Sequence, residues 1–382
     1  MDLFETKKAL RDHLTSLTKE LVRFPSHVNE PLKIFELIEF IKSYFEKEKV
    51  VANMHVFGGL PSLVITTEET KSPRILLSGH IDVVPSSTRY ITEEEDGWLF
   101  GSGAMDMKGG VAVMMALMKH WSRQEKPPSL GIMITSDEEI GSDNGTTPLL
   151  EQEGYRADFV LINEGRYAYD IVTREKGILL VNLVTTGEFI HSAYPWRAKN
   201  SIEELMKALL EIKKIFPPPS DAWVPTCSVT IIRGGEETNT IPGRAEAVLN
   251  IRLTGGKRWC EEAVLKKIKK CLPKNIEIAE ANYGEVFLSD ERNPYIRSLR
   301  KVARKVLKNP VSFGENHGAS DARIFMKHGI TTAVLGPVGK NHHTPLEAVD
   351  IESLVTHFEV LKKFIAEESR SLQKSQVEIL KT

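Results

Sequence analysis

Side chains that can bind metal ions or move protons follow several short apolar or glycine-rich runs of this chain. In chain order they are His80 and Asp82, then Asp106, then Glu138 and Glu139, then Glu164, and finally His343. One such ending would be ordinary surface chemistry. Because ligands of α/β proteins bind at the ends of strands, this many endings predict one shared site.

The composition of this set predicts which ions it would bind. Two imidazoles and three or more carboxylates, with no cysteine among them, suit zinc, cobalt or manganese and do not suit a thiolate structural site. Carboxylates in excess of what one ion needs predict two metal ions about 3.5–4 Å apart with a shared bridging ligand.

Asp106 is the central residue of this prediction. It lies between paired glycines in residues 101–110, just before the apolar run 111–118. Glycine allows tight turns and close backbone approach, so a carboxylate in such a segment can be directed into a pocket. Considered alone, Asp106 would be better explained as the cap of the following helix. The other carboxylates and imidazoles favour the metal site.

The elements that must position these residues follow an α/β pattern. Residues 1–25 and 31–49 are predicted helices, and strands then alternate with helices to about residue 170. This alternation favours a parallel or mixed sheet covered on both faces. In residues 175–288 the pattern changes to β-α-β-β-α-β, the split βαβ arrangement. From about residue 294 onward the α/β character returns.

Candidate ligands lie on both sides of the β-α-β-β-α-β block. A single site that uses His343 together with the earlier residues therefore requires this block to be an insertion. We expect a catalytic domain in two parts, residues 1–174 and 289–382, with residues 175–288 inserted between them.

Composition limits the classes of partner. The chain has 382 residues, with 50 Lys and Arg against 52 Asp and Glu. Because these charges nearly cancel, we expect neither nucleic acid nor a membrane surface as a partner. Three cysteines without ligand spacing predict a reducing, cytoplasmic location. The N-terminal segment is charged, and no apolar run is long enough to span a bilayer.

Five segments in the same order carry a resemblance to a known family. They are residues 78–85 (SGHIDVVP), 101–110 (GSGAMDMKGG), 137–141 (DEEIG), 163–165 (NEG) and 343–347 (HTPLE). Together they resemble the di-zinc family that contains acetylornithine deacetylase, succinyl-diaminopimelate desuccinylase, aminoacylase and glutamate carboxypeptidase. The resemblance implies an α/β fold of the zinc-exopeptidase type, a mixed sheet flanked by helices. It also implies an inserted ferredoxin-like (βαββαβ) lid and dimerisation domain.

The resemblance further implies a set of metal ligands. Asp106 would bridge two divalent ions. His80 and Glu164 would complete the ligands of one ion, and Glu139 and His343 those of the other. The ions are expected to be zinc, with cobalt or manganese able to substitute.

Two residues beside the ligands are expected to act in catalysis. Asp82 would orient the imidazole of His80 through its second nitrogen, and Glu138 would act as the general base. Water held between the two ions would give its proton to Glu138 and attack the amide carbonyl as a metal-bridged hydroxide. Glu138 would then return the proton to the leaving amine.

Residues of the inserted block and of the C-terminal part match family positions that contact substrate. His191 would donate a hydrogen bond to the developing oxyanion, and Asn239 would hold the substrate. Arg252 would clamp a carboxylate in a bidentate manner. Ser320 lies in a loop that resembles the Gly-Thr-Ser-Asp loop of the desuccinylases, with alanine in place of threonine.

The implied function is hydrolysis of the amide bond of an N-acyl amino acid, as in acetylornithine deacetylase or succinyl-diaminopimelate desuccinylase. The alternative within the family is a dipeptidase or a glutamate-type carboxypeptidase. We also expect a homodimer formed through the inserted domain. In dimeric family members the histidine that corresponds to His191 acts across the interface, although a role within its own chain stays open.

Overall fold

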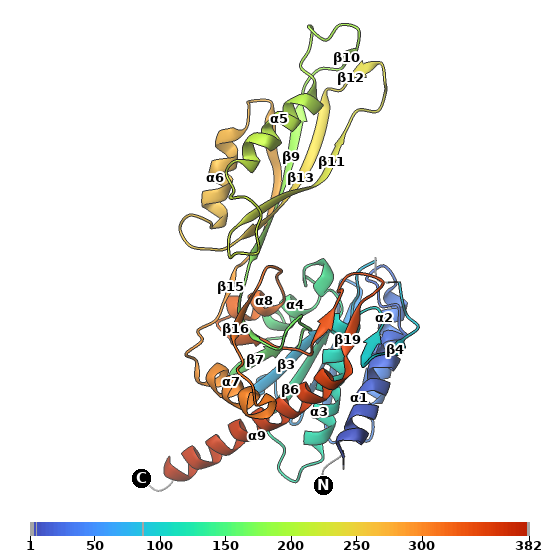
Figure 1. Ribbon diagram of the computed structural model, residues 1–382, viewed down its shortest axis with the longest axis vertical. Coiled ribbons are helices and arrows are strands. Elements are labelled where there is room, and N and C mark those ends of the chain that lie inside the picture. Colours follow the sequence, from blue (N-terminus) through green and yellow to red (C-terminus); the bar gives the residue numbers. More distant parts are fainter. Residues whose placement is uncertain (1–3, 5, 86–87, 380–382) are drawn as a thin grey trace. The chain divides into compact units, whose positions relative to one another are not determined.

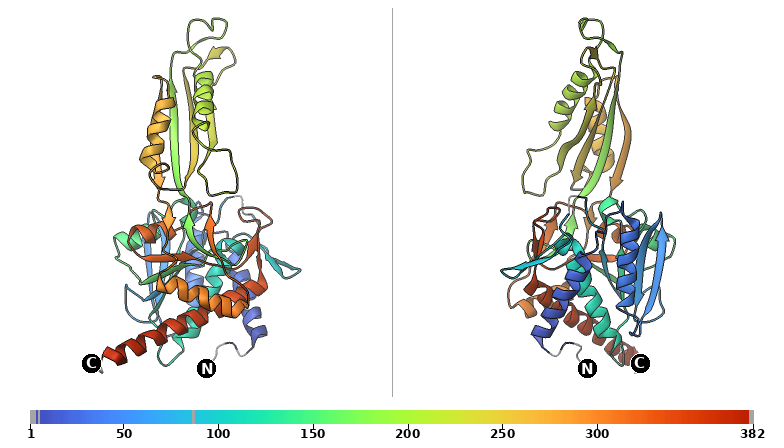
Figure 2. Two further views of the ribbon diagram at one scale, coloured as in Figure 1. Left: turned by 60° about the vertical axis from the view of Figure 1, so that its left-hand side comes forward. Right: turned by 90° about the vertical axis from the view of Figure 1, so that its right-hand side faces the viewer.

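The computed structural model describes residue 4, residues 6–85 and residues 88–379. The chain divides into two compact units, each with its own hydrophobic core (Figures 1 and 2). Unit 1 contains Met1–Thr173, Ser289–Gly314 and Ile324–Thr382, and unit 2 contains Arg174–Leu288 and Glu315–Arg323. Unit 2 thus also contains Glu315–Arg323, which the sequence patterns placed in the second part of the catalytic domain.

Unit 1 is built on a mixed sheet. The strands run in the order β1 (Val51–Phe57), β2 (Leu60–Thr66), β6 (Leu130–Thr135), β3 (Ile75–His80), β7 (Phe159–Ile162), β17 (Thr331–Val334) and β8 (Ile171–Glu175). β3 pairs in parallel with β6 and with β7, whereas β2 pairs antiparallel with β1 and β6. Every residue of β3 and β6 is buried, as is usual for apolar strands covered on both faces. The mixed α/β sheet expected from the sequence is confirmed.

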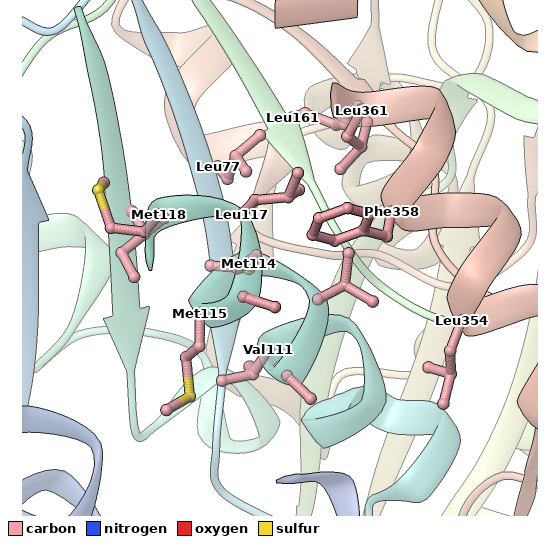
Figure 3. Packing of buried hydrophobic residues seen from close by; sticks show 14 of the residues in the cluster. Leu77, Val111, Met114, Met115, Leu117, Met118, Leu161, Leu354, Phe358 and Leu361 are labelled. Carbon is pink, nitrogen blue, oxygen red and sulfur yellow. The ribbon is translucent and has the colours of Figure 1, made fainter. Parts of the chain in front are cut away.

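Helices α1 (Lys7–Val22), α3 (Gly109–Ser122), α7 (Pro294–Leu307) and α9 (Ile351–Ile379) pack together in unit 1. α3 is buried on nearly all sides, which is the pattern of a core helix. Its Met114 and Leu117 lie between two groups of residues, Leu77 and Leu161 on the strands and Phe358 on α9 (Figure 3). α2 (Pro31–Ser43) packs on β2, and the short helices are α4 (Thr146–Glu151) and α8 (Ala322–Lys327).

A second, smaller sheet joins two distant parts of unit 1. Its strands run in the order β18 (Gly339–Lys340), β19 (Ala348–Asp350), β5 (Trp98–Phe100) and β4 (Glu93–Glu95). β19 pairs antiparallel with β5, with Ala348 opposite Phe100. The N–H of Gly101 also donates to the main-chain oxygen of Glu347 at 3.0 Å. This sheet therefore brings the segment before β19 beside the glycine-rich segment after β5.

Unit 2 has the element order of a split βαβ sandwich. Its main elements are β9 (Gly177–Thr186), α5 (Ser201–Lys213), β11 (Thr226–Gly234), β13 (Arg244–Leu253), α6 (Glu261–Cys271) and β14 (Ile276–Gly284). The strands lie in the order β11-β13-β9-β14. Burial alternates along β13, so one face of the sheet packs against the helices. Short strands β10 (Ile190–His191) and β12 (Thr240–Ile241) form a separate pair, and β15 (Phe287–Leu288) and β16 (Phe313–Asn316) pair with β8.

No helix within the described ranges is both long enough and apolar enough to cross a lipid bilayer.

Candidate metal centre and active site

Parallel pairing places the candidate residues of three strands at one edge of the main sheet. His80 is the last residue of β3 and pairs with Thr135, the last residue of β6. Glu138 and Glu139 follow β6 in a short helical turn. Glu164 follows β7 by two residues, and the register of Ser78 with Ile162 places it level with His80. Because these strands run in the same direction, their carboxyl ends meet at this edge.

Asp106 reaches the same place from the turn between β5 and α3. The turn spans Ala104–Lys108 and follows Gly103, whose φ of 76° is in the left-handed region that favours glycine. Gly110, in the first turn of α3, approaches the end of β7 closely. A Cβ on Gly110 would lie 2.0 Å from the main-chain oxygen of Asn163. The paired glycines of the sequence thus allow the turn and the helix to pack directly against the strand ends.

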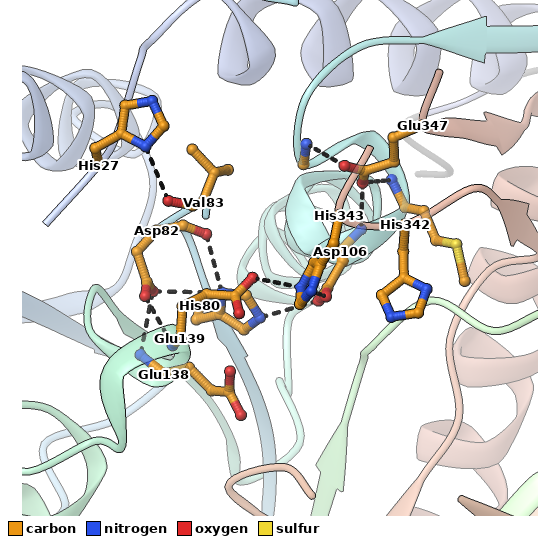
Figure 4. A network of polar contacts seen from close by, with 12 residues as sticks. His27, His80, Asp82, Val83, Asp106, Glu138, Glu139, His342, His343 and Glu347 are labelled. Carbon is orange, nitrogen blue, oxygen red and sulfur yellow. Dashed lines mark hydrogen bonds and ion pairs between the residues drawn. The ribbon is translucent and has the colours of Figure 1, made fainter. Parts of the chain in front are cut away.

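The two oxygens of the Asp106 carboxylate face two different imidazoles (Figure 4). His80 Nε2 lies 3.1 Å from Asp106 Oδ1, and His343 Nε2 lies 3.1 Å from Asp106 Oδ2. His343 Nε2 is also 2.9 Å from Glu139 Oε1. Ligand atoms of Asp106, Glu139 and His343 all lie within 4.8 Å of one another. This nitrogen and oxygen donor set, with one carboxylate between two imidazoles, fits a pair of divalent metal ions that share a bridging ligand.

Protonation of the site follows from these contacts. Hydrogen bonds to Asp106 and Glu139 raise the pKa of His343 to about 10. Burial lowers the pKa of His80, but hydrogen bonds to Asp106 and Asp82 outweigh it, so this pKa is raised well above its usual value. Burial acts to raise the pKa of Asp106, yet the two imidazoles hold it below its usual value. Without metal, therefore, the raised pKa values favour the imidazolium forms of both histidines beside the carboxylates. Metal ions would replace these protons, because imidazole ligates only when its nitrogen is free.

Asp82 connects the imidazole of His80 to the turn after β6. Asp82 Oδ1 lies 3.3 Å from His80 Nδ1. The same carboxylate accepts main-chain N–H groups from Glu138 at 3.3 Å and from Glu139 at 2.9 Å. Asp82 is completely buried. One side chain thus contacts the His80 imidazole and fixes the turn from which Glu138 and Glu139 extend in different directions (Figure 4).

Comparison with known proteins agrees with this geometry. Residues 76–367 match the sequence model of Peptidase family M20/M25/M40. The chain belongs to this family. The succinyl-diaminopimelate desuccinylase of Granulibacter bethesdensis is 31% identical over 319 residues, which cover 76% of this chain and 82% of that protein. The family resemblance read from the sequence is confirmed.

Two solved structures have the same fold. The crystal structure of aminopeptidase PepT from Bacillus cereus matches with a TM-score of 0.76 at 20% identity, covering 93% of this chain and 98% of its own. YXEP of Bacillus subtilis, described as a dinuclear metal-binding peptidase of the M20 family, matches with a TM-score of 0.66 at 13% identity. That match covers 95% of this chain and 99% of YXEP.

Glu347 has a structural role in this M20/M25/M40 site that the sequence patterns did not assign. Its buried carboxylate accepts main-chain N–H groups from Gly103, Met105 and Asp106, each at 2.9 Å (Figure 4). Burial and the charge of Asp106 raise its pKa to about 7, although the three N–H donors oppose this. Glu347 therefore holds the turn that presents Asp106. The only signal in the sequence was its place four residues after His343 in a family segment.

The remaining candidate residues of this family member belong to unit 2. His191 in β10 lies opposite Thr240 of β12, and Ser192 donates its N–H to the main-chain oxygen of Asn239 at 2.7 Å. His191 and Asn239 are therefore neighbours. Arg252 lies apart from them, near the other end of β13.

Arg252 and Ser320 have contrasting surroundings. Burial lowers the pKa of the Arg252 guanidinium, and within the described residues it forms no ion pair with a carboxylate. An arginine in that condition suits an anionic ligand. Ser320 is buried and donates both its N–H and its hydroxyl to Glu175, at 3.0 and 2.7 Å. Its hydroxyl oxygen also accepts the N–H of Ala322 at 3.2 Å, so in this arrangement the hydroxyl has no proton left to donate to a ligand.

Proposed function

We propose that this chain is a metal-dependent amidohydrolase that cleaves the amide bond of an N-acyl amino acid. The observation that carries the proposal is the Asp106 carboxylate held between His80 and His343, at 3.1 Å from each. Membership in a peptidase family and 31% identity to a succinyl-diaminopimelate desuccinylase support hydrolysis of amides and favour deacylation. Similarity to the aminopeptidase, at 20% identity, extends only to the fold.

Five residues would hold two ions. Asp106 would bridge them, with His80 and Glu164 on one ion and Glu139 and His343 on the other. Zinc is the proposed metal, and cobalt or manganese should substitute, because nitrogen and carboxylate ligands accept all three. When bound, the ions supply Lewis acidity, which activates water near neutral pH and polarises a carbonyl.

Glu138 would move the proton in the reaction. Its side chain extends from the turn that also contains Glu139 and is partly exposed, so water and substrate can approach it. It would take a proton from the attacking water and deliver that proton to the nitrogen of the leaving amino acid. Asp82 would keep the His80 imidazole in its ligating orientation by accepting a hydrogen bond from Nδ1.

Unit 2 would supply the substrate contacts. Arg252 would bind the carboxylate of the amino acid, because a half-buried guanidinium without a carboxylate partner is prepared for such an anion. His191 would donate to the carbonyl oxygen as charge develops on it, and its neighbour Asn239 would contact the substrate. Ser320, whose hydroxyl donates to Glu175, would lie beside the acyl end of the substrate.

The direct test is a substrate panel on the metal-loaded protein. Zinc- or cobalt-loaded chain should hydrolyse N-succinyl or N-acetyl amino acids faster than dipeptides or N-acyl substrates that lack the carboxylate. Chelation should abolish turnover, and added zinc, cobalt or manganese should restore it. Full activity in metal-free protein would refute the metal-dependent mechanism. Faster turnover of dipeptides would replace the deacylase proposal by a peptidase.

We further propose a cytoplasmic homodimer in which His191 completes the site of the partner chain. Free cysteines at positions 227, 260 and 271 suit a reducing compartment. Glu138→Ala and His191→Ala proteins should each be nearly inactive, since loss of an oxyanion donor costs about 10²–10³-fold in kcat. Refolded together, they should regain roughly a quarter of wild-type activity, because mixed dimers contain one intact site. Verified mixed dimers without recovery would place His191 in its own chain's site or outside catalysis.

A further inference from the structure

Helix α7 of unit 1 carries a row of basic side chains on the face opposite the core. Its buried residues are Ile296, Leu299, Val302 and Ala303. Arg297, Lys301 and Arg304 are exposed. Since they are spaced by three or four residues, they lie next to one another along one face.

In the described part of the chain, the positive charges of this row are not paired with nearby carboxylates, which bind other basic side chains. At the start of α7, Arg292 pairs with Asp290 at 3.0 Å, and near its end Lys305 pairs with Glu367 at 3.4 Å. Among the side chains that the structure describes, Arg297, Lys301 and Arg304 form no ion pair. Like charges four residues apart repel each other on a helix. Mutual repulsion within the row therefore acts against α7, and only Arg304, in the last turn, gains from the helix dipole.

The row borders a groove with a volume of about 560 Å³, lined also by Glu291, Arg292, Arg300, Lys305 and Phe313. This volume is within the range of small-molecule sites. Arg300 is fixed in the groove, because its Nε donates to the oxygen of Val311 at 2.7 Å and its guanidinium lies 4.3 Å from the centre of the Phe313 ring. A guanidinium held in this way loses little side-chain entropy when it binds a further group.

We propose that this groove binds a small molecule with two or more phosphate groups. Guanidinium and ammonium groups pair with phosphate oxygens, and each terminal phosphate brings about −1.5 to −2 charges at neutral pH. Arg297, Arg300, Lys301 and Arg304 bring four positive charges and Glu291 one negative charge to the groove, so two such groups would neutralise it. The carboxylates of Asp290 and Glu367 limit the positive region at its two ends, which disfavours a long polyanion or a lipid surface. All of these residues lie in unit 1, and the proposal is independent of the proposed hydrolase activity.

Calorimetric titration of the metal-loaded full chain with ATP at 0.15 M salt tests the proposal. ATP should bind, and inorganic triphosphate should bind as well, because the phosphates carry the recognition. The variant Arg297→Gln/Lys301→Gln/Arg304→Gln should bind ATP at least about 100-fold more weakly, since each charge-assisted hydrogen bond contributes roughly tenfold or more. If the triple variant does not fold, Arg304→Gln alone should still lose about tenfold.

A matched control removes the same charge elsewhere. Lys207 and Lys214 are exposed, Lys33 is partly exposed, and each pairs with a glutamate three residues away. The variant Lys33→Gln/Lys207→Gln/Lys214→Gln should bind ATP like the wild type.

Three results would overturn the proposal. The first is a failure of both ATP and inorganic triphosphate to bind. The second is ATP binding that the α7 variants leave unchanged, which would place the nucleotide elsewhere, for example at the metal centre. The third is that the wild type binds anionic vesicles or single-stranded RNA but not ATP, and that the α7 substitutions abolish this binding.

Discussion

Replacing Asp82 with asparagine changes one side-chain oxygen into an N–H donor at nearly constant volume. In the protein, Oδ2 of Asp82 accepts the N–H of Glu139 at 2.9 Å. Oδ1 accepts the N–H of Glu138 at 3.3 Å and lies 3.3 Å from Nδ1 of His80. Whichever way the new amide is oriented, its NH2 group meets at least one of these donors.

The size of the effect depends on what remains around His80. Leaving a buried donor without a partner costs about 1–3 kcal/mol. Loss of a group that orients a ligating imidazole lowers metal affinity about 10–100-fold. The main-chain oxygen of Asp82 also lies 3.2 Å from His80 Nδ1, so one acceptor for this N–H is retained. We therefore expect the lower end of the range, about tenfold weaker zinc binding.

Competition with a chelating dye measures the zinc affinity of Asp82→Asn, and urea unfolding of the metal-free protein measures its stability. Asp143→Asn is a suitable control, because Asp143 is exposed and lies in the loop that follows Glu138 and Glu139. Equal zinc affinities of the two variants would refute the orienting role. A loss far above about 100-fold would instead place Asp82 among the direct ligands.

Three further substitutions test other parts of the site and its support. Glu138→Gln should keep its zinc and its melting temperature but lose roughly 10²–10⁴-fold in kcat, and near-normal turnover would exclude Glu138 as the base. Buried His357 bonds to Asn163 and Tyr169 at 3.0 and 2.9 Å, and burial lowers its pKa from 6.5 to about 3. Between pH 6.5 and about 3, the unfolded chain binds a proton at His357 and the folded chain does not. The stability contribution present above pH 6.5 should therefore be lost as the pH falls towards 3. Urea unfolding of His357→Leu should depend less on pH, and an unchanged dependence would contradict this assignment. Gly110→Ala, with its Cβ 2.0 Å from the oxygen of Asn163, should lower the free energy of unfolding by roughly 1–3 kcal/mol, and wild-type stability in urea would show that α3 can shift freely.

Apolar periodicity predicted the fold well wherever burial alone decides the structure. The run that ends at His80 became the fully buried strand β3. Local patterns were weaker where tertiary contacts decide where an element ends. The helix predicted for residues 31–49 ends at Ser43, and turns follow it, with the N–H of Phe45 bonded to the oxygen of Lys42. The glutamates and lysines after Ser43 favour a helix by their intrinsic propensity, so the local sequence contained no stop signal.

The site was predictable to the extent that its residues follow strands or glycines. His80, Asp106, Glu139 and His343 were all found in this way, and the structure brings them together. The function of Glu347 could not be found, because its partners are three main-chain N–H groups that become neighbours only through the pairing of β19 with β5. The substrate contacts proposed in unit 2 stay predictions.

The late position of Glu347 and His343 in the chain also has a consequence for synthesis on the ribosome. Translation proceeds at about 5–20 residues per second, so His343 emerges roughly 10–35 s after Glu164. During that interval the turn around Asp106 lacks the carboxylate that accepts its N–H groups. A nascent chain can thus expose most of its ligands without a complete centre, and a chain that terminates before residue 343 would never acquire one. Completion of the site therefore reports that synthesis has passed residue 347.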